Sequence, residues 1–247
     1  MVGAAVRRRL SWQIVTVTEF VEETARVKTI VLDVPDWTEH RAGQHLDIRL
    51  TADDGYRAER EYSIASAPGE AVAITVERLE DGEVSPYLTE VLRAGDALEV
   101  RGPLGGYFVW GPEDGGPLLL VGGGSGIVPL RSILRHRDRS ESDVPVRLLY
   151  SSRSLEDVIY RAELDDPAGG VEVVHTLTRA QPPGWTGRSR RVDRELLAEI
   201  AWRAEENPLA FVCGPTSFVE TVASGLVELG YPGERIKTER FGATGGT

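Results

Sequence analysis

The pattern of hydrophobic and polar positions divides the chain into two parts that meet near Pro112. In the first part, short apolar runs alternate with turns, at a spacing of roughly 10–15 residues that is typical of an antiparallel barrel or sandwich. The runs are WQIVTVTEFV, RVKTIVLDV, QHLDIRL, REYSIAS, AVAITVERL and DALEVRG. One short helix is predicted from Ser85 to Leu92, with Ser85 as its N-terminal cap and Pro86 at its first helical position.

In the second part, apolar strands alternate with amphipathic helices. The strands are PLLLVGG, VPVRLLY, VEVVHTL, LAFVCG and RIKTERF. Helices are predicted from about Val128 to His136, over SLEDVIYRAEL with Ser154 as its cap and Asp157 three residues on, and around DRELLAEIAW. A longer helix has Phe218, Val222, Leu226 and Leu229 on one face. This alternation predicts a doubly wound parallel sheet, which binds ligands at the carboxyl ends of its strands.

The predicted fold class is therefore β followed by α/β. Residues 1–112 are expected to form an antiparallel Greek-key β-barrel domain. Residues 113–247 are expected to form a Rossmann-like domain around a doubly wound parallel sheet. A chain of 247 residues has room for two such domains.

Composition excludes several classes of function. The 28 basic and 39 acidic residues give a net charge of −11, and no Lys/Arg-rich run is present, so nucleic-acid binding is not expected. Cys213 is the only cysteine, which excludes an intrachain disulfide and a cysteine-ligated cluster. The four histidines lack metal-ligand spacing, so no metal is predicted. No secretory signal and no 18-residue apolar run is found, so we expect no membrane span and a cytoplasmic protein.

The strongest candidate for a phosphate site is the segment LLLVGGGSGIVPL. A buried strand leads into Gly124, Ser125 and Gly126, and a helix begins just beyond. Glycines let the backbone approach a pyrophosphate, and the helix N-terminus supplies free N–H donors. Pro129 stands where the usual motif has its third glycine, and proline is tolerated in the first helical turn.

The second strand of the α/β part ends in YSSRS, which bears on the choice of dinucleotide. An acidic residue at this place binds the ribose of NAD, whereas an arginine suits the 2′-phosphate of NADP. Ser152 and Arg153 therefore favour NADPH over NADH, with Arg179 and Arg188 as further candidates.

Two segments of the β part carry a second set of polar groups. REYS places Arg60, Tyr62 and Ser63 on one strand, where they could pair with phosphate, stack on a ring and hydrogen-bond a heteroatom. DGEVSPYL offers Gly82, Val84 and Ser85 at a helix N-terminus, a second place for an anion. Two anion sites, one in each domain, indicate two nucleotide-like ligands.

Taken together, these motifs resemble the ferredoxin–NADP reductase family of two-domain flavoproteins over nearly the whole chain. The matching elements occur in the family's order: REYS, GEVSPYL, GPLGGYF, VGGGSGIVP, YSSRS…YRAEL, LTR…GWTG, VCGP and TERFG. The resemblance implies FAD as the flavin, with FMN used by some members. The flavin-binding positions that it implies in the β part are Arg60, Tyr62, Ser63, Val76, Arg78, Gly82, Val84 and Ser85.

The resemblance also implies a role for several of these residues. Arg60 binds the flavin pyrophosphate, Tyr62 packs along the flavin, and Ser63 bonds near its N5 atom. The pyridine nucleotide is bound by Gly124, Ser125 and Gly126, and its nicotinamide lies beside Cys213, Gly214 and Pro215. Phe241 and Glu239 approach the flavin from the C-terminal strand. Ser63, Cys213 and Glu239 are the implied catalytic residues.

The implied function is an NAD(P)H-dependent reductase that passes electrons to a redox protein, such as a ferredoxin, an oxygenase component or another metalloenzyme. Only ATGGT follows Gly242, without the four-cysteine domain of many relatives, so the acceptor is expected to be a separate protein and the enzyme a monomer. Two alternatives stay open: a reductase that releases reduced flavin, and a nucleotide-binding regulatory or assembly subunit without turnover. Arg7, Arg8, Arg9, Arg57 and Arg60 are candidates for a basic docking patch.

Overall fold

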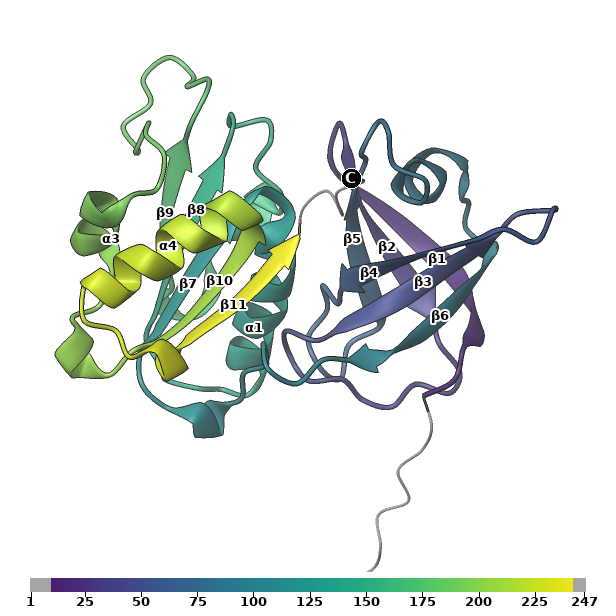
Figure 1. The fold of residues 1–247 in the computed structure, drawn as a ribbon, viewed down its shortest axis with the longest axis horizontal. Coiled ribbons are helices and arrows are strands. Elements are labelled where there is room, and N and C mark those ends of the chain that lie inside the picture. Colours follow the sequence, from purple (N-terminus) through teal and green to yellow (C-terminus); the bar gives the residue numbers. More distant parts are fainter. Residues whose placement is uncertain (1–9, 242–247) are drawn as a thin grey trace, which may run out of the picture.

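The computed structural model describes residues 10–241 and contains two β-sheets that lie side by side (Figure 1). The first sheet has the strand order β4-β3-β6-β1-β2-β5, and all its strand pairs are antiparallel. Its strands are β1 Gln13–Thr24, β2 Val27–Asp33, β3 His45–Thr51, β4 Arg57–Ser63, β5 Val72–Glu77 and β6 Ala97–Leu104. An antiparallel bridge between Ile64 and Ile74 joins the two edge strands, so the sheet closes into the predicted barrel.

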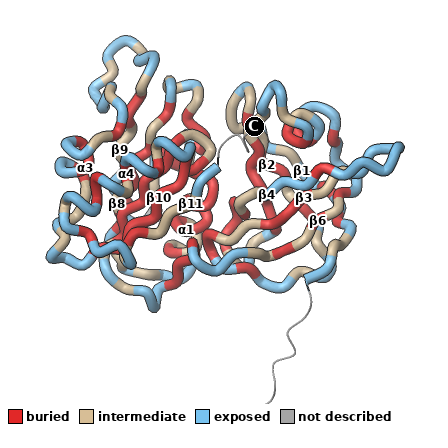
Figure 2. The backbone as a smooth tube through the Cα atoms, viewed as in Figure 1, coloured by how far each residue is buried: buried red, intermediate tan, exposed pale blue. Residues whose placement is uncertain are grey.

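The barrel follows the predicted alternation of side chains. In β1, Val15 and Val17 are buried and Ile14 and Thr16 are exposed. Buried residues of all six strands form one cluster inside the barrel. Figure 2 marks the buried stretches of the chain in red. A π-helix, Tyr87–Val91, covers one end of the barrel and contributes Leu88 to its core.

The second sheet is parallel and has the order β11-β10-β7-β8-β9. Its strands are β7 Leu118–Gly123, β8 Val146–Ser152, β9 Glu172–Leu177, β10 Leu209–Pro215 and β11 Ile236–Phe241. The helices are α1 Ile127–Arg139, α2 Arg161–Asp165, α3 Arg194–Ile200 and α4 Thr216–Glu228. Since the chain passes from β7 outward to β9 and then returns to β10, the strand order reverses between β7 and β10, where ligands of such sheets bind. The predicted fold class is confirmed.

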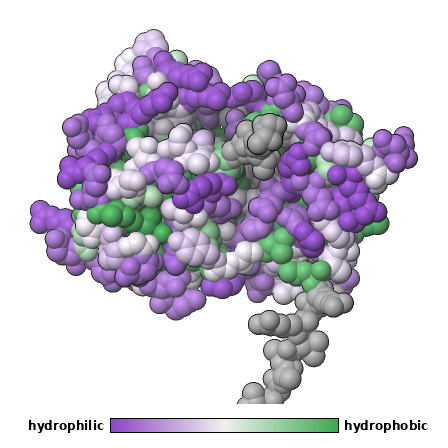
Figure 3. Space-filling model, viewed as in Figure 1, coloured by the Kyte–Doolittle hydropathy of each residue, from purple (hydrophilic) through white to green (hydrophobic). Residues whose placement is uncertain are grey.

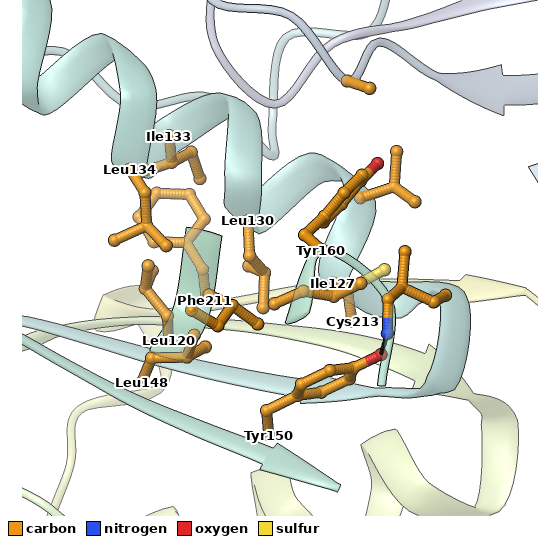
Figure 4. Packing of buried hydrophobic residues seen from close by; sticks show 14 of the residues in the cluster. Leu120, Ile127, Leu130, Ile133, Leu134, Leu148, Tyr150, Tyr160, Phe211 and Cys213 are labelled. Atoms are coloured by element: carbon orange, nitrogen blue, oxygen red, sulfur yellow. Dashed lines mark hydrogen bonds between the residues drawn. The ribbon is translucent and has the colours of Figure 1, made fainter. Parts of the chain in front are cut away.

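Helix α1 lies between the parallel sheet and the barrel (Figure 1). Leu130 and Ile133 of this helix pack with Leu120 and Phe211 of the sheet, as Figure 4 shows. The same cluster includes residues of the first part of the chain, and Phe108 meets the ring of Phe211 edge-on at 5.1 Å. The apolar core is thus continuous across the contact between the two sheets, while α3 and α4 cover the other face.

Two predictions of local structure are wrong. The segment 154–164 is not one helix: α2 begins only at Arg161, and Tyr160 before it has φ +59°. Val158, Ile159 and Tyr160 are all buried, so burial of three successive side chains prevails over the helical pattern. Ser154 donates to the Asp157 carboxylate at 2.8 Å instead of capping a helix.

The second wrong prediction is the cap at Ser85. Its hydroxyl accepts a hydrogen bond from the backbone N–H of Leu79 at 3.0 Å, and no side chain caps the π-helix. The other helices and strands are found where the sequence predicts them, within a few residues. Among residues 10–241, no helix is long and apolar enough to cross a membrane.

Candidate functional site

A pocket of about 370 Å³ lies at the point where the strand order reverses. It is lined by the ends of β7, β8 and β10, by the start of α4 and by the end of β11, with the end of β5 on the barrel side. Six predicted site residues line it together: Gly124, Ser152, Arg153, Arg179, Pro215 and Phe241. Residues from both parts of the chain therefore form one cavity.

The glycine-rich loop has the shape that a phosphate site needs. Gly124 has φ +57° and no neighbouring atom within 4 Å of the place where a Cβ would stand. A Cβ on Gly126 would lie 2.1 Å from the carbonyl oxygen of Cys213, so only glycine fits between this loop and β10. The loop is a 3-10 turn that leads directly into α1, and Pro129 lies in the first turn of that helix, as predicted. Its open side at Gly124 and the N–H groups of the turn suit a pyrophosphate.

Four arginines line the pocket: Arg153, Arg179 and Arg191 of the second part of the chain, and Arg26 of the barrel. Arg191 was not predicted, because it stands in a loop without any recognisable motif. Arg188, a sequence candidate, instead pairs with Glu199 at 2.7 Å and is not among the lining residues. Arg153, Arg179 and Arg191 therefore offer cationic side chains to an anionic ligand in this pocket.

A polar network that the sequence did not predict connects the barrel to the second part of the chain at the pocket. Ser125 donates to Glu77 at 2.9 Å, and Arg26 lies 3.6 Å from Glu77 and 3.9 Å from Asp157. Arg26 and Glu77 belong to the barrel, whereas Ser125 and Asp157 belong to the second part. Arg26, Glu77 and Asp157 come from a turn, a strand end and a loop, so no local pattern marks them. Ser125 was predicted as a phosphate-binding residue but not as a partner of Glu77.

Glu239, Ser63 and Cys213 meet at the contact between the two sheets. Glu239 on β11 is the register partner of Cys213 on β10. Burial, and then the nearby charge of Glu61, raise the pKa of Glu239 to about 7, while a hydrogen bond with Ser63 lowers it. The Oε2 atom of Glu239 is buried and has no hydrogen-bond partner in the part of the chain that the structure describes. The three residues predicted to be catalytic are thus brought together.

Cys213 is buried in the core between the sheets. Burial raises the pKa of its thiol well above the usual range, and the charge of Glu239 raises it further. The thiol is therefore protonated at neutral pH and presents a small neutral surface. Gly214 beside it has no room for a Cβ, which would lie 2.7 Å from the ring of Phe218.

The predicted flavin residues of the barrel lie on β4, at the end of β5 and in the loop that follows it. Tyr62 is half-buried, and burial raises the pKa of its hydroxyl to about 12. Arg60 is exposed and pairs with Glu83 at 2.6 Å. Arg78 stands just after β5, where it pairs with Glu90.

The loop Gly82–Ser85 is tight. A Cβ on Gly82 would lie 2.8 Å from the hydroxyl oxygen of Ser85. The side chains of Val76 and Val84 face the barrel core, so only their backbones could contact a flavin. Because the π-helix has only five residues, an anion here would depend on loop N–H groups and Arg60 more than on a helix dipole.

One further group could be taken for a metal site. His45, Asp47 and Glu61 place ligand atoms within 4.8 Å of one another. However, Asp47 already accepts a hydrogen bond from the Nε atom of Arg101 at 3.0 Å, so this cation compensates its charge. We assign no metal to this group. Arg7, Arg8 and Arg9 of the predicted basic patch lie outside the described residues.

Comparison with known proteins identifies both parts of the chain. The oxidoreductase FAD-binding domain family matches residues 14–109, and the oxidoreductase NAD-binding domain family matches residues 120–224. Ferredoxin–NADP reductase B of Sorangium cellulosum is 36% identical over 81% of this chain and 84% of its own. The chain belongs to the ferredoxin–NADP reductase-like family of FAD/NAD-binding oxidoreductases.

Other members of this family extend beyond the matched region. The ferredoxin reductase component of the 3-ketosteroid-9-alpha-monooxygenase of Rhodococcus rhodochrous is 35% identical over 94% of this chain, which spans 66% of that protein. Among solved structures, the flavohem-like FAD/NAD-binding domain of a nitric oxide dioxygenase from Vibrio cholerae superposes with a TM-score of 0.84. It is 26% identical and covers 93% of this chain and 98% of its own.

The residues present fit the two ligands of this family. The pocket joins a glycine loop to four arginines, which suits the pyrophosphate of a nicotinamide dinucleotide. On the barrel side, the buried Oε2 atom of Glu239, which has no hydrogen-bond partner among the described residues, is a polar group that a bound flavin could satisfy. Members of the family bind FAD in the first domain and a nicotinamide dinucleotide in the second.

Proposed function

We propose that this protein is an NADPH-dependent flavoprotein reductase that delivers electrons to a separate redox protein, such as a ferredoxin or an oxygenase component. The observation that carries the proposal is the meeting of Ser63, Cys213 and Glu239, each from a different strand, beside the pocket lined by Phe241. A binding protein without turnover would have no use for a titrating carboxyl at this place. The 3-ketosteroid reductase component is named as part of an oxygenase system, which supports the choice of acceptor.

The pocket residues would bind and orient the nucleotide. Arg153, Arg179 and Arg191 supply the charge for a 2′-phosphate, and the N–H groups of the glycine loop receive the pyrophosphate. Pro215 and Phe241 close the end of the pocket nearest Glu239, so they limit the positions open to the nicotinamide. Fixing the distance and angle between two reactants is the main contribution of such a site.

When bound, FAD supplies the redox chemistry, since it accepts a hydride from the reduced nicotinamide and gives up electrons one at a time. The protein would supply groups that transfer a proton and a buried surface that excludes water. The buried Cys213 thiol keeps its proton and would present a small neutral side chain beside Glu239. With a pKa of about 7, Glu239 can both give and take a proton at neutral pH, and the hydroxyl of Ser63 is its partner toward the barrel.

Anaerobic reduction tests this proposal. The purified protein, supplied with FAD, should be bleached by NADPH within one turnover, and more slowly by NADH at the same concentration. Candidate acceptors, such as a [2Fe–2S] ferredoxin, should then restore the yellow colour. A protein that binds FAD but is never bleached would be a binding module, and one that loses its flavin on reduction would be a free flavin reductase.

Three other predictions belong to the same proposal. We propose that the boundary between the two domains lies near Pro112, and the short turn Pro112–Asp114 between β6 and β7 supports this position. We further propose that the enzyme works as a monomer in the cytoplasm. Gel filtration of the FAD-loaded protein tests the first of these two statements.

A further inference from the structure

The arginine assigned to the flavin pyrophosphate is already engaged by the protein. The Nη2 atom of Arg60 donates to Oε2 of Glu83 at 2.6 Å, and Nη1 donates to the backbone carbonyl of Glu59 at 2.8 Å. These bonds use two of the five N–H donors of the guanidinium, and the bond to Glu83 also compensates its charge. A phosphate bound to Arg60 would therefore lie beside the Glu83 carboxylate or would displace it.

Glu83 is held in place from its other side. Its Oε1 atom accepts a hydrogen bond from the hydroxyl of Tyr56 at 2.9 Å. Hydrogen bonds from Tyr56 and Arg60 lower the pKa of Glu83, so it is charged at neutral pH. Glu83 also lies inside the loop Gly82–Ser85, the loop assigned to the flavin phosphates. A negative charge therefore stands in the place that a diphosphate is expected to occupy.

We propose that Glu83 competes with the diphosphate of FAD for Arg60 and thereby sets the affinity and the rate of exchange of the flavin. This inference rests on the proposed function. A diphosphate that arrives must either displace the carboxylate from Arg60 or accept its charge nearby, and both reduce the free energy of binding. Tyr56 gives the displaced carboxylate a partner, so the exchange leaves Glu83 with a hydrogen bond.

The charge of the loop alone does not explain the effect. Glu80 and Asp81 are exposed acidic residues of the same segment, and neither has a hydrogen bond or ion pair with Arg60 among the described residues. If general repulsion weakened flavin binding, neutralising any of the three would have a similar effect. Competition for Arg60 confines the effect to Glu83.

The test is a titration of the flavin-free full-length protein with FAD at fixed ionic strength, followed by quenching of flavin fluorescence. Glu83→Gln should tighten binding about fivefold and speed association, whereas Glu80→Gln and Asp81→Asn should change the dissociation constant less than twofold. In an Arg60→Ala background, Glu83→Gln should give no gain. Riboflavin, which lacks phosphate, should bind wild type and Glu83→Gln equally.

Each outcome decides the matter. Equal or weaker FAD binding by Glu83→Gln would overturn the competition, and would mean that Glu83 orients Arg60 or has no role. A gain that also appears with riboflavin, or with Glu80→Gln, would overturn it as well. If wild type and all variants fail to bind FAD, the proposed function itself fails, a result distinct from equal binding.

Discussion

Cys213 and Glu239 are register partners on the parallel strands β10 and β11, and the charge of Glu239 helps to keep the Cys213 thiol protonated. Both stand where the edge of the parallel sheet meets the barrel, with Ser63 opposite Glu239. A neutral thiol and a carboxyl that titrates near neutrality thus lie in one place. Their different protonation follows from burial in one case and from a balance of burial and hydrogen bonding in the other.

Glu239→Gln should change how stability depends on pH. In the unfolded chain this carboxyl loses its proton near the ordinary value of 4.5, and in the folded protein near 7. Between these values the folded state binds more protons, so wild-type stability should fall as the pH rises from 4.5 to 7, by up to about 3 kcal/mol. The variant should lack this fall. Urea unfolding at four pH values measures it, and parallel curves for the two proteins would contradict the assignment.

The same substitution should alter turnover. If Glu239 moves a proton at Ser63, the pH profile of acceptor reduction should show an inflection near pH 7 in wild type that is absent in Glu239→Gln. Ser63→Ala should slow flavin reduction about tenfold or more while changing the affinity for FAD little. Stopped-flow reduction by NADPH measures this rate, and an unchanged rate would exclude a role for the hydroxyl.

The preference for NADPH should reside in the arginines of the pocket. Arg153→Ala and Arg191→Ala should each raise the KM for NADPH about tenfold or more and leave the KM for NADH nearly unchanged, since only NADPH carries the 2′-phosphate. Arg188→Ala is the matched control, because Arg188 pairs with Glu199 and is not among the residues that line the pocket. Equal effects on both nucleotides would show that these arginines bind the shared pyrophosphate.

A contact between the barrel and β11 should help to hold Glu239 in place. The hydroxyl of Tyr107 donates to the carbonyl of Ile236 at 3.1 Å, and the Lys237 ammonium lies 4.5 Å from the centre of the Tyr107 ring. Tyr107→Phe and Lys237→Met should each lower the free energy of unfolding by about 0.5–1 kcal/mol. Lys28→Met is the control, since Lys28 pairs with Glu22 on the barrel alone.

Tyr107→Phe and Lys237→Met can also be tested by the pH profile of acceptor reduction. Because Lys237 and Glu239 are two residues apart on one strand, their side chains lie on the same face of the sheet. If β11 is less firmly held, the inflection near pH 7 in the pH profile of acceptor reduction should shift. Lys237→Arg, which keeps the positive charge, should leave the inflection at its wild-type position. If the inflection stays in place while stability falls, the contact is structural only.

The sequence predicted most of the fold because each part of the chain has a single, consistent pattern. In β1 the buried Val15 and Val17 alternate with exposed residues, and β7 buries all six of its residues, as a barrel strand and a central parallel strand should. The prediction of a helix at 154–164 was wrong because of a contact that no local sequence pattern can show. The hydroxyl of Tyr160 reaches Thr75 of the barrel, and this contact requires the other domain.

The residues of the candidate site that belong to sequence motifs were predicted. Residues that join the site from other loops were missed. Gly126 could be recognised because a glycine-rich loop between a buried strand and a helix is typical of a phosphate-binding site. Arg191 and Arg26 reach the pocket only because the strand order brings their loops there. The raised pKa of Glu239 likewise depends on burial and on Glu61, a residue of the barrel.

The glycine loop itself offers the last prediction, a comparison of two alanine substitutions two residues apart. A Cβ at position 126 would lie 2.1 Å from the backbone oxygen of Cys213, which cannot move without breaking the β10–β11 register. Gly126→Ala should therefore cost at least about 2 kcal/mol of stability. At Gly124 there is open space, so Gly124→Ala should cost only about 1 kcal/mol, from the positive φ.

The effect of Gly124→Ala on NADP⁺ binding should be larger than its small effect on stability would suggest. Gly124→Ala should still fold and yet weaken NADP⁺ binding, because its Cβ would project into the open side of the loop. Gly106→Ala, which also meets no atom within 4 Å, serves as the control outside the pocket and should leave NADP⁺ binding unchanged. Thermal unfolding and equilibrium titration with NADP⁺ measure both quantities. Equal stability of the two loop variants would mean that this loop does not pack against β10 as closely as the structure has it.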